Sequence, residues 1–136
     1  MSTRATVHFT YDPDGKPDAI VYRHSDGYPE GLGEDLKAFL TDIAANVNDT
    51  RFGDPSYLAA KWVVWDVLRG KREAIGFYQR MATENLRYVK EVERMQAQHP
   101  CEFLGVGIVS EDPGDINYRY TVTCRGGVPT IKVEEV

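Results

Sequence analysis

The sequence predicts an α+β fold, with a mainly antiparallel sheet of about five strands and two or three helices packed on one face. Three observations favour this class. The first residues alternate apolar and polar side chains with the period of two that strands have. The middle of the chain has apolar residues at helical spacing. The last third returns to alternation broken by turn residues, and strands, helices and strands in this order are typical of α+β domains.

Two strands are expected at the N-terminal end. Residues 5 to 11 place one set of side chains on each side of a strand: Ala5, Val7, Phe9 and Tyr11 against Thr6, His8 and Thr10. The turn that follows contains Pro13 and Gly15, which suit a hairpin. A second strand is therefore expected at about residues 18 to 24.

Helices are expected over the middle of the chain. An apolar stripe predicts one helix from Leu32 to about residue 48. Asp54 and Pro55 resemble a helix start, and Gly70 resembles the end of that second helix. Thr83 is the predicted cap of a third helix within residues 71 to 99.

Three further strands are expected at residues 103 to 109, 116 to 124 and 128 to 136. Turn residues separate them, at Pro113 and Gly114 and again at Gly126 and Gly127. Strands linked by short turns usually pair with their neighbours in sequence, so this region is predicted to be a three-strand meander. The 136 residues suit a single domain, 1–136.

Composition excludes several classes of function. A net charge of −5 disfavours non-specific nucleic-acid binding, which needs a basic face. No apolar run approaches the ~20 residues of a membrane span, and no apolar segment follows the first residues, so a cytoplasmic protein without a membrane partner is expected. Two cysteines, Cys101 and Cys124, and three scattered histidines show no metal-site spacing, so neither a metal nor a cofactor is predicted.

The segment from Tyr22 to Gly33 holds the least ordinary chemistry of the chain. It places charged, aromatic and glycine residues between a predicted strand and a predicted helix, where binding residues are often found. Glycines before a helix leave backbone N–H groups that suit an anion. The candidate ligand-binding residues are Arg4, Arg23, His24, Asp26, Tyr28, Gly31 and Gly33.

Two other interpretations of this loop stay open. His24 and Asp26 are two residues apart, and an imidazole beside a carboxylate can act as a general base, as in a small phosphoester hydrolase. No serine or cysteine stands in a recognised nucleophile context, so enzyme activity is not the favoured interpretation. Alternatively, Gly27 and Pro29 serve only to lock a turn, and the acidic surface or residues 71 to 100 form an oligomer or partner interface.

Several motifs resemble a family of small uncharacterised bacteriophage and prophage proteins. The matching residues lie at the start of the chain, in the loop, in the predicted helices and in a late tyrosine-rich region: Thr3, Arg4, Tyr22, Arg23, His24, Asp26, Gly27, Tyr28, Pro29, Glu30, Gly31, Gly33, Leu36, Leu40, residues 56 to 60, Gly107, Asp115, Tyr118, Tyr120 and Val122. The resemblance implies a phage or prophage setting and no particular chemistry. Compared with the shorter proteins of that family, residues 71–100 resemble a helical insertion. We therefore expect a non-enzymatic accessory protein that binds a small anionic, nucleotide-like ligand or a host protein, for example in phage–host conflict; a homo-oligomer is compatible with this.

Overall fold

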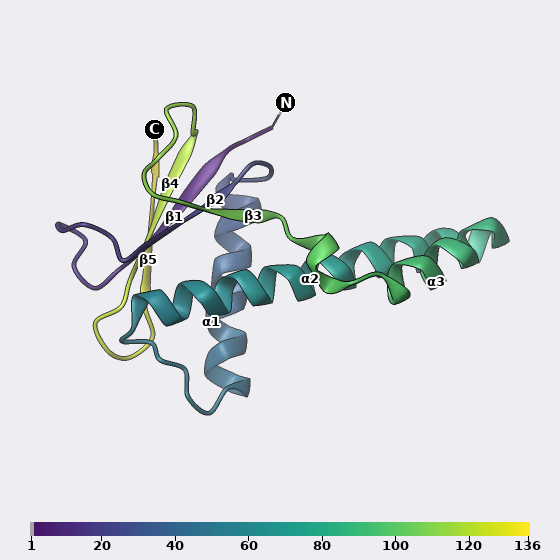
Figure 1. The fold of residues 1–136 in the computed structure, drawn as a ribbon, viewed down its shortest axis with the longest axis horizontal. Coiled ribbons are helices and arrows are strands. Elements are labelled where there is room, and N and C mark those ends of the chain that lie inside the picture. Colours follow the sequence, from purple (N-terminus) through teal and green to yellow (C-terminus); the bar gives the residue numbers. More distant parts are fainter. Residues whose placement is uncertain (1) are drawn as a thin grey trace. The chain divides into compact units, whose positions relative to one another are not determined.

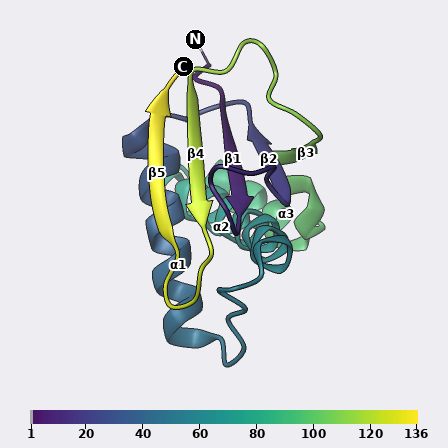
Figure 2. The same cartoon turned by 90° about the vertical axis from the view of Figure 1, so that its left-hand side faces the viewer.

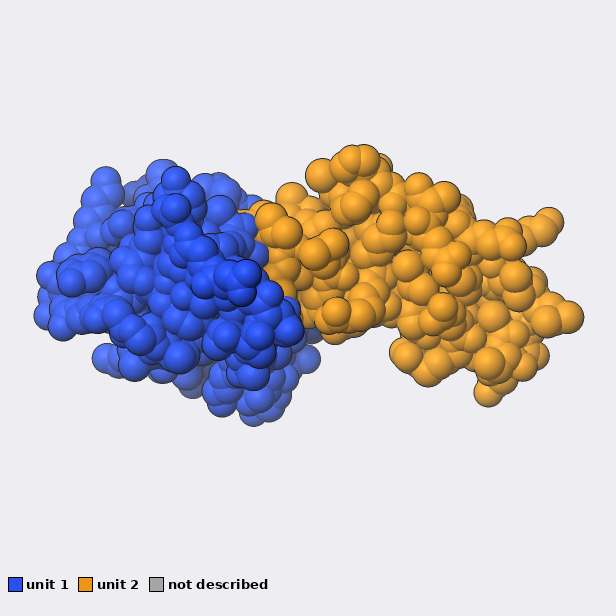
Figure 3. Space-filling view, turned by 90° about the horizontal axis from the view of Figure 1, so that it is seen from below, with its two compact units in different colours: residues 1–62, 106–136 blue, residues 63–105 orange. Residues whose placement is uncertain are grey.

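The computed structural model describes residues 2–136, and this part of the chain forms two compact units. Unit 1 contains the described residues up to Trp62 together with Val106–Val136, and unit 2 contains Val63–Gly105. Figure 3 colours unit 1 blue and unit 2 orange. The prediction that residues 1–136 are one domain stays a prediction.

Unit 1 is built on a five-stranded sheet, which confirms the predicted α+β class. The strands run in the order β3-β2-β1-β4-β5, and Figure 2 shows them side by side, with β5 and β3 at the two edges. All pairs are antiparallel except β1 with β4, which are parallel. The strands are β1 (Ala5–Thr10), β2 (Ala19–Arg23), β3 (Val106–Val109), β4 (Tyr118–Thr123) and β5 (Thr130–Glu135).

The predicted C-terminal meander is wrong in its first pairing: β4 and β5 pair with each other as predicted, but β3 does not pair with β4. Strand β3 pairs with β2 at one edge, whereas β4 lies next to β1 on the other side of the first hairpin. The connection at residues 110–117 therefore carries the chain past two strands instead of making a tight hairpin. Turn residues such as Pro113 and Gly114 indicate where a strand ends, but they do not indicate which strand it will join.

Alternation along the strands separates two faces of the sheet. Ala5, Val7 and Phe9 are almost fully buried, and they share their face with the buried ring of Tyr120. Leu36 and Phe39 of helix α1 (Glu34–Asn46) are buried too, and the Phe39 ring meets Trp62 edge-on at 5.4 Å between centroids. This apolar layer is the core of unit 1. The opposite face of the sheet, called the open face here because α1 packs on the other side, carries Thr6 and His8, and Thr6 is itself buried.

The second helix is longer than the sequence predicts. Helix α2 (Pro55–Glu84) continues through Gly70, which the sequence marks as its end (Figure 1). A glycine costs a helix only about 1 kcal/mol relative to alanine. Here the missing Cβ leaves room for the backbone near Phe103, because a Cβ on Gly70 would lie 2.9 Å from the Phe103 carbonyl oxygen.

The third helix begins after the predicted cap. Thr83 lies inside α2, where its hydroxyl donates to the Arg80 carbonyl at 2.7 Å. Asn85 instead caps the short 3-10 helix that precedes the third helix, where its side chain accepts from the Arg87 N–H, and the residue before the third helix, Tyr88, makes no side-chain cap hydrogen bond. The short η2 (Leu86–Tyr88), α3 (Val89–Ala97) and η3 (Pro100–Phe103) complete unit 2. Within residues 2–136, no helix combines the length and apolar character that a membrane span requires.

Candidate functional site

The predicted loop is tied to the scaffold by its backbone. The Gly27 N–H donates to the Thr3 carbonyl at 2.9 Å, and the buried Tyr120 hydroxyl donates to the Gly27 carbonyl at 2.8 Å. Burial raises the pKa of Tyr120 to about 12, so this hydroxyl stays a donor at neutral pH. The centre of the loop is therefore fixed between the first strand and the core.

Two glycines of the loop are required by close approach. A Cβ on Gly27 would lie 2.7 Å from the Ala5 Cβ, and one on Gly31 would lie 2.5 Å from the Asp26 carbonyl oxygen. Asp26 itself has a φ of 57°, a left-handed conformation that aspartate tolerates better than most residues. Packing therefore explains Gly27 and Gly31, whereas a Cβ on Gly33 would make ordinary contacts, the nearest at 3.5 Å.

Backbone donors at the start of α1 already have partners inside the chain. The last five residues of the loop form the short π-helical turn η1 (Pro29–Gly33), which leads directly into α1. The Gly31 N–H donates to the Tyr28 carbonyl and the Leu32 N–H to the Asp26 carbonyl, both at 3.0 Å. The backbone of Gly33 makes a hydrogen bond with the Tyr120 side chain. An anion at this end of the helix would have to compete with these bonds.

The seven predicted ligand-binding residues do not gather in one place. Arg23 is 8 % exposed on the helix-covered face, and its guanidinium donates to the Asp35 carboxylate at 2.8 Å. On the open side, the Arg4 Nε lies 3.4 Å from the His24 Nδ1, and Arg4 also pairs with Asp115 at 3.0 Å. Both arginines are therefore already neutralised by carboxylates.

The other predicted polar groups form a separate pair. The Tyr28 hydroxyl lies 3.5 Å from the Asp26 carboxylate. Within residues 2–136, no hydrogen bond or ion pair joins the His24 ring to Asp26; the His24 Nδ1 lies 3.1 Å from the Tyr22 hydroxyl instead. A hollow of about 300 Å³ next to the loop includes Gly33 but also Glu30 and Glu34. The assignment of ligand binding to these seven residues stays a prediction.

A more connected polar network lies on the open face of the sheet. Asp112, from the β3–β4 connection, accepts hydrogen bonds from the Thr6 hydroxyl at 2.7 Å and the Arg119 Nε at 2.6 Å. Its Oδ1 also lies 2.7 Å from the His8 Nε2. Thr6 and His8 project from β1 and Arg119 from β4, so one carboxylate fastens the connection to two neighbouring strands.

The Asp112 carboxyl is held in its ionised form. Burial by itself would raise its pKa, but the hydrogen bonds from His8, Thr6 and Arg119 outweigh burial, so the pKa lies below its usual value. An ionised carboxylate can accept a hydrogen bond from the Nε2–H of His8, and this bond fixes the orientation of the ring. The ring is thereby held at the edge of an adjoining pocket.

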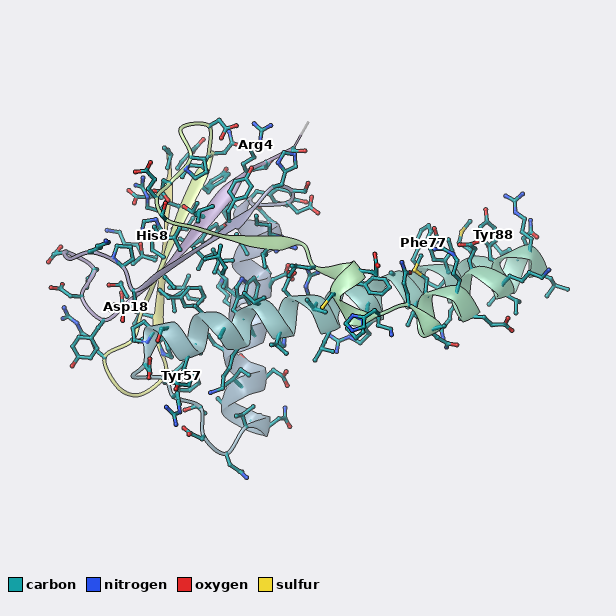
Figure 4. All side chains as sticks on the ribbon, in the orientation of Figure 1. Arg4, His8, Asp18, Tyr57, Phe77 and Tyr88 are labelled. Carbon is teal, nitrogen blue, oxygen red and sulfur yellow. The ribbon has the colours of Figure 1, made fainter. Side chains whose placement is uncertain are left out.

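This pocket has a volume of about 430 Å³ and lies between the β1–β2 turn and the β3–β4 connection. His8 and Asp18, labelled in Figure 4, both line it. Its lining combines apolar side chains with one lysine and three carboxylates: Pro17, Ala19, Ile20, Val109, Lys16, Asp18, Glu111 and Asp112, together with Ser110. Such a pocket suits a ligand with an apolar stem and a positively charged end.

The sequence did not single out these pocket residues as a site. His8 was recognisable as a polar residue on one side of a predicted strand, and Glu111 and Asp112 as turn residues. Nothing local connects residue 8 with residue 112, because their contact depends on β4 pairing with β1. The site forms because the pairing of β2 with β3 places Val109 beside Ile20, and the connection that follows then crosses to β4, which pairs with β1.

No protein-family model matches this chain, and no curated protein or solved structure matches it either. The resemblance to phage proteins therefore stays a prediction.

Proposed function

We propose that this chain is a non-enzymatic binding protein, in the phage or prophage setting that the resemblance implies, and that unit 1 recognises a basic side chain of a protein partner. The observation that carries the proposal is the pocket beside His8. It offers apolar surface to methylene groups and carboxylates to an ammonium or guanidinium group. This proposal selects the protein-partner form of the expected function over the small anionic ligand.

The charge of the pocket favours a cation. Its lining carries Lys16 against Asp18, Glu111 and Asp112; because Asp112 is already paired with Arg119, the carboxylates left for a ligand are Asp18 and Glu111. The whole of unit 1 has nine basic and fifteen acidic residues, a net charge of −6. An acidic pocket on an acidic unit attracts cationic partners and repels anionic ones.

The geometry of the predicted loop supports the same choice. A small anionic ligand would need an available cation or free backbone N–H groups. Arg4 and Arg23 are paired with carboxylates, and the N–H groups of Gly31 and Leu32 donate within the chain. Displacing these partners would cost much of the energy that binding supplies.

The test is an affinity measurement with a simple probe. N-acetyl-arginine amide and N-acetyl-lysine amide are titrated into the protein by calorimetry at low salt, with N-acetyl-glutamate amide as the anionic comparison. We expect the two cationic probes to bind, and the double variant Asp18→Asn with Glu111→Gln to bind about tenfold more weakly, because two carboxylates at the pocket are lost. The matched control is Asp14→Asn with Glu135→Gln, which removes the same charge from exposed residues outside the pocket. Equal binding by both double variants would contradict the proposal. A rise in melting temperature with nucleotides but not with the cationic probes would favour the small anionic ligand instead.

A second candidate function is hydrolysis, favoured by the contact between His8 and Asp112. A carboxylate that orients an imidazole at a pocket is the arrangement of a general base, and the geometry supports it better than the predicted pair His24 and Asp26. Ser110 lines the same pocket, but no hydrogen bond among residues 2–136 joins it to His8.

The hydrolysis hypothesis has a direct test. Under it, p-nitrophenyl phosphate or acetate would be cleaved by the wild-type protein, and His8→Ala would lose at least about a hundredfold in rate. His24→Ala is the control, because its ring lies outside the pocket. We expect no turnover above buffer for either ester, in keeping with a protein that only binds. Turnover by the wild-type protein that is lost in His8→Ala would favour hydrolysis over binding as the function.

A further inference from the structure

Unit 2 lacks an apolar core of its own. Within Val63–Gly105 the one buried residue is Asp66, at 1 % exposure, and every apolar side chain is half-buried or exposed. A helical pair without buried apolar groups obtains little stability from packing, and helices of this length depend on packing for most of their stability. The unit therefore has apolar surface that remains to be covered.

Polar contacts set the shape of unit 2. The Lys71 ammonium donates to the carbonyls of Gln96 and Gln98, at 3.1 and 2.9 Å, and so joins α2 to the end of α3. The Asp66 carboxylate accepts from the Gly105 N–H at 3.0 Å. Near the other end, the rings of Tyr78 and Tyr88 lie 6.1 Å apart. These contacts hold α2 and α3 as a hairpin with a tip at residues 85–89 and a base at residues 63–68 and 100–105.

The exposed apolar groups lie at both ends of this hairpin. At the base is a pocket of about 270 Å³ with a wholly apolar lining that includes Val64, Leu68 and Leu104. At the tip, Leu86 is 81 % exposed, the highest exposure among the large apolar side chains of the described chain. A projecting leucine and an apolar pocket on the same unit can complement each other between two copies.

We propose that the surface is covered by the hairpin of a second copy of this chain, with the two hairpins antiparallel and each Leu86 seated in the base pocket of the other copy. Leu68 and Leu86 are eighteen residues apart, mostly along α2, so tip and base are separated by about 27 Å at 1.5 Å per residue. A single chain cannot fill its own pocket across that distance. A two-fold antiparallel pair fills both pockets at once, which is the self-complementarity that a symmetric dimer requires.

Charge favours a second hairpin as the occupant. Unit 2 has seven basic and six acidic residues, a net charge of +1, so two hairpins meet without strong repulsion. Pairing through unit 1 would bring together two surfaces of net charge −6. The balanced charge of the hairpin therefore selects unit 2 for contact between copies. This inference does not depend on the pocket beside His8.

Sedimentation equilibrium of the full chain is the first test. We expect a dimer, with twice the 15.4 kDa mass of the chain, at tens of micromolar protein. Leu86→Glu and Leu68→Glu should each weaken dimerisation at least tenfold. Their side chains are 81 % and 55 % exposed, so both variants should retain the helical signal in circular dichroism. Ile108→Glu, at an equally exposed apolar position of unit 1, is the matched control and should leave the dimer unchanged.

A cross-linking experiment tests the antiparallel arrangement. Cys101 is exposed and lines the base pocket, whereas Cys124 is buried. In Leu86→Cys, oxidised glutathione should produce a dimer joined between the new thiol and Cys101 of the other copy, identified by mass spectrometry of the linked peptides. Phe77→Cys, midway in sequence between Leu68 and Leu86, is the control and should not link to Cys101. A chain that stays monomeric at roughly 200 micromolar would overturn the proposal. A dimer that survives Leu86→Glu would overturn it too.

Discussion

Replacing Gly27 or Gly31 with alanine is expected to lower the free energy of unfolding by about 3 kcal/mol in each case. The added methyl group would lie 2.7 Å from the Ala5 Cβ at the first position and 2.5 Å from the Asp26 carbonyl oxygen at the second. The backbone has to move to relieve either contact, which disturbs the hydrogen bonds of Gly27 with Thr3 and Tyr120. Urea denaturation followed by circular dichroism measures the change.

Gly107→Ala is the matched control. A Cβ there meets nothing within 4 Å, so its stability should stay within about 0.5 kcal/mol of the wild type. If Gly27→Ala and Gly31→Ala unfold normally but lose binding to a partner or a nucleotide, the loop is a receptor surface after all. A loss of stability without a separate loss of binding supports the locked-turn interpretation of the motif.

Asp112→Asn is expected to cost about 2–3 kcal/mol, because it removes the charge that accepts hydrogen bonds from Thr6, His8 and Arg119. The effect should depend on pH. The pKa of Asp112 is lower in the folded chain than the usual 3.8, so the ionised carboxylate stabilises the fold above that pH. This stabilisation is lost as the pH falls through the lower folded pKa. The difference between wild type and variant should therefore be full at pH 6 and shrink below about pH 4.

Asp115→Asn is the control for this variant. Asp115 lies in the same connection, but its side chain is 61 % exposed and pairs with Arg4 at the surface, where an ion pair contributes at most about 1 kcal/mol. Thermal or urea unfolding at several pH values compares the two variants. Equal costs for Asp112→Asn and Asp115→Asn would show that the network on the open face contributes no special stability.

Local patterns predicted the elements of unit 1 better than their arrangement. The alternation in residues 5 to 11 identified β1, and the apolar stripe identified α1, because burial of one face imposes these periods directly. The position of β3 beside β2 depends on contacts far apart in sequence, which no local pattern records. Gly70 was mistaken for a helix end because its close approach to Phe103 has no signature near residue 70.

The candidate site was harder to predict for the same reason. The loop from Tyr22 to Gly33 is unusual in composition, but Gly27 and Gly31 have packing roles that depend on the folded backbone. His8 looked like an ordinary strand residue until the β3–β4 connection brought Asp112 to within 2.7 Å of its ring. Sequence could indicate polar residues on one face of β1; it could not indicate that the open face is where they meet a carboxylate and a pocket.

The most direct test of the central claim is the location of cation binding on unit 1. Backbone amide chemical shifts would be recorded by two-dimensional NMR while N-acetyl-arginine amide is added. We predict that the largest changes occur at the pocket, at His8, Asp18, Ile20, Val109 and Glu111. Changes concentrated at Tyr28 to Gly33, or shifts that do not saturate at any position, would contradict recognition of a basic side chain beside His8.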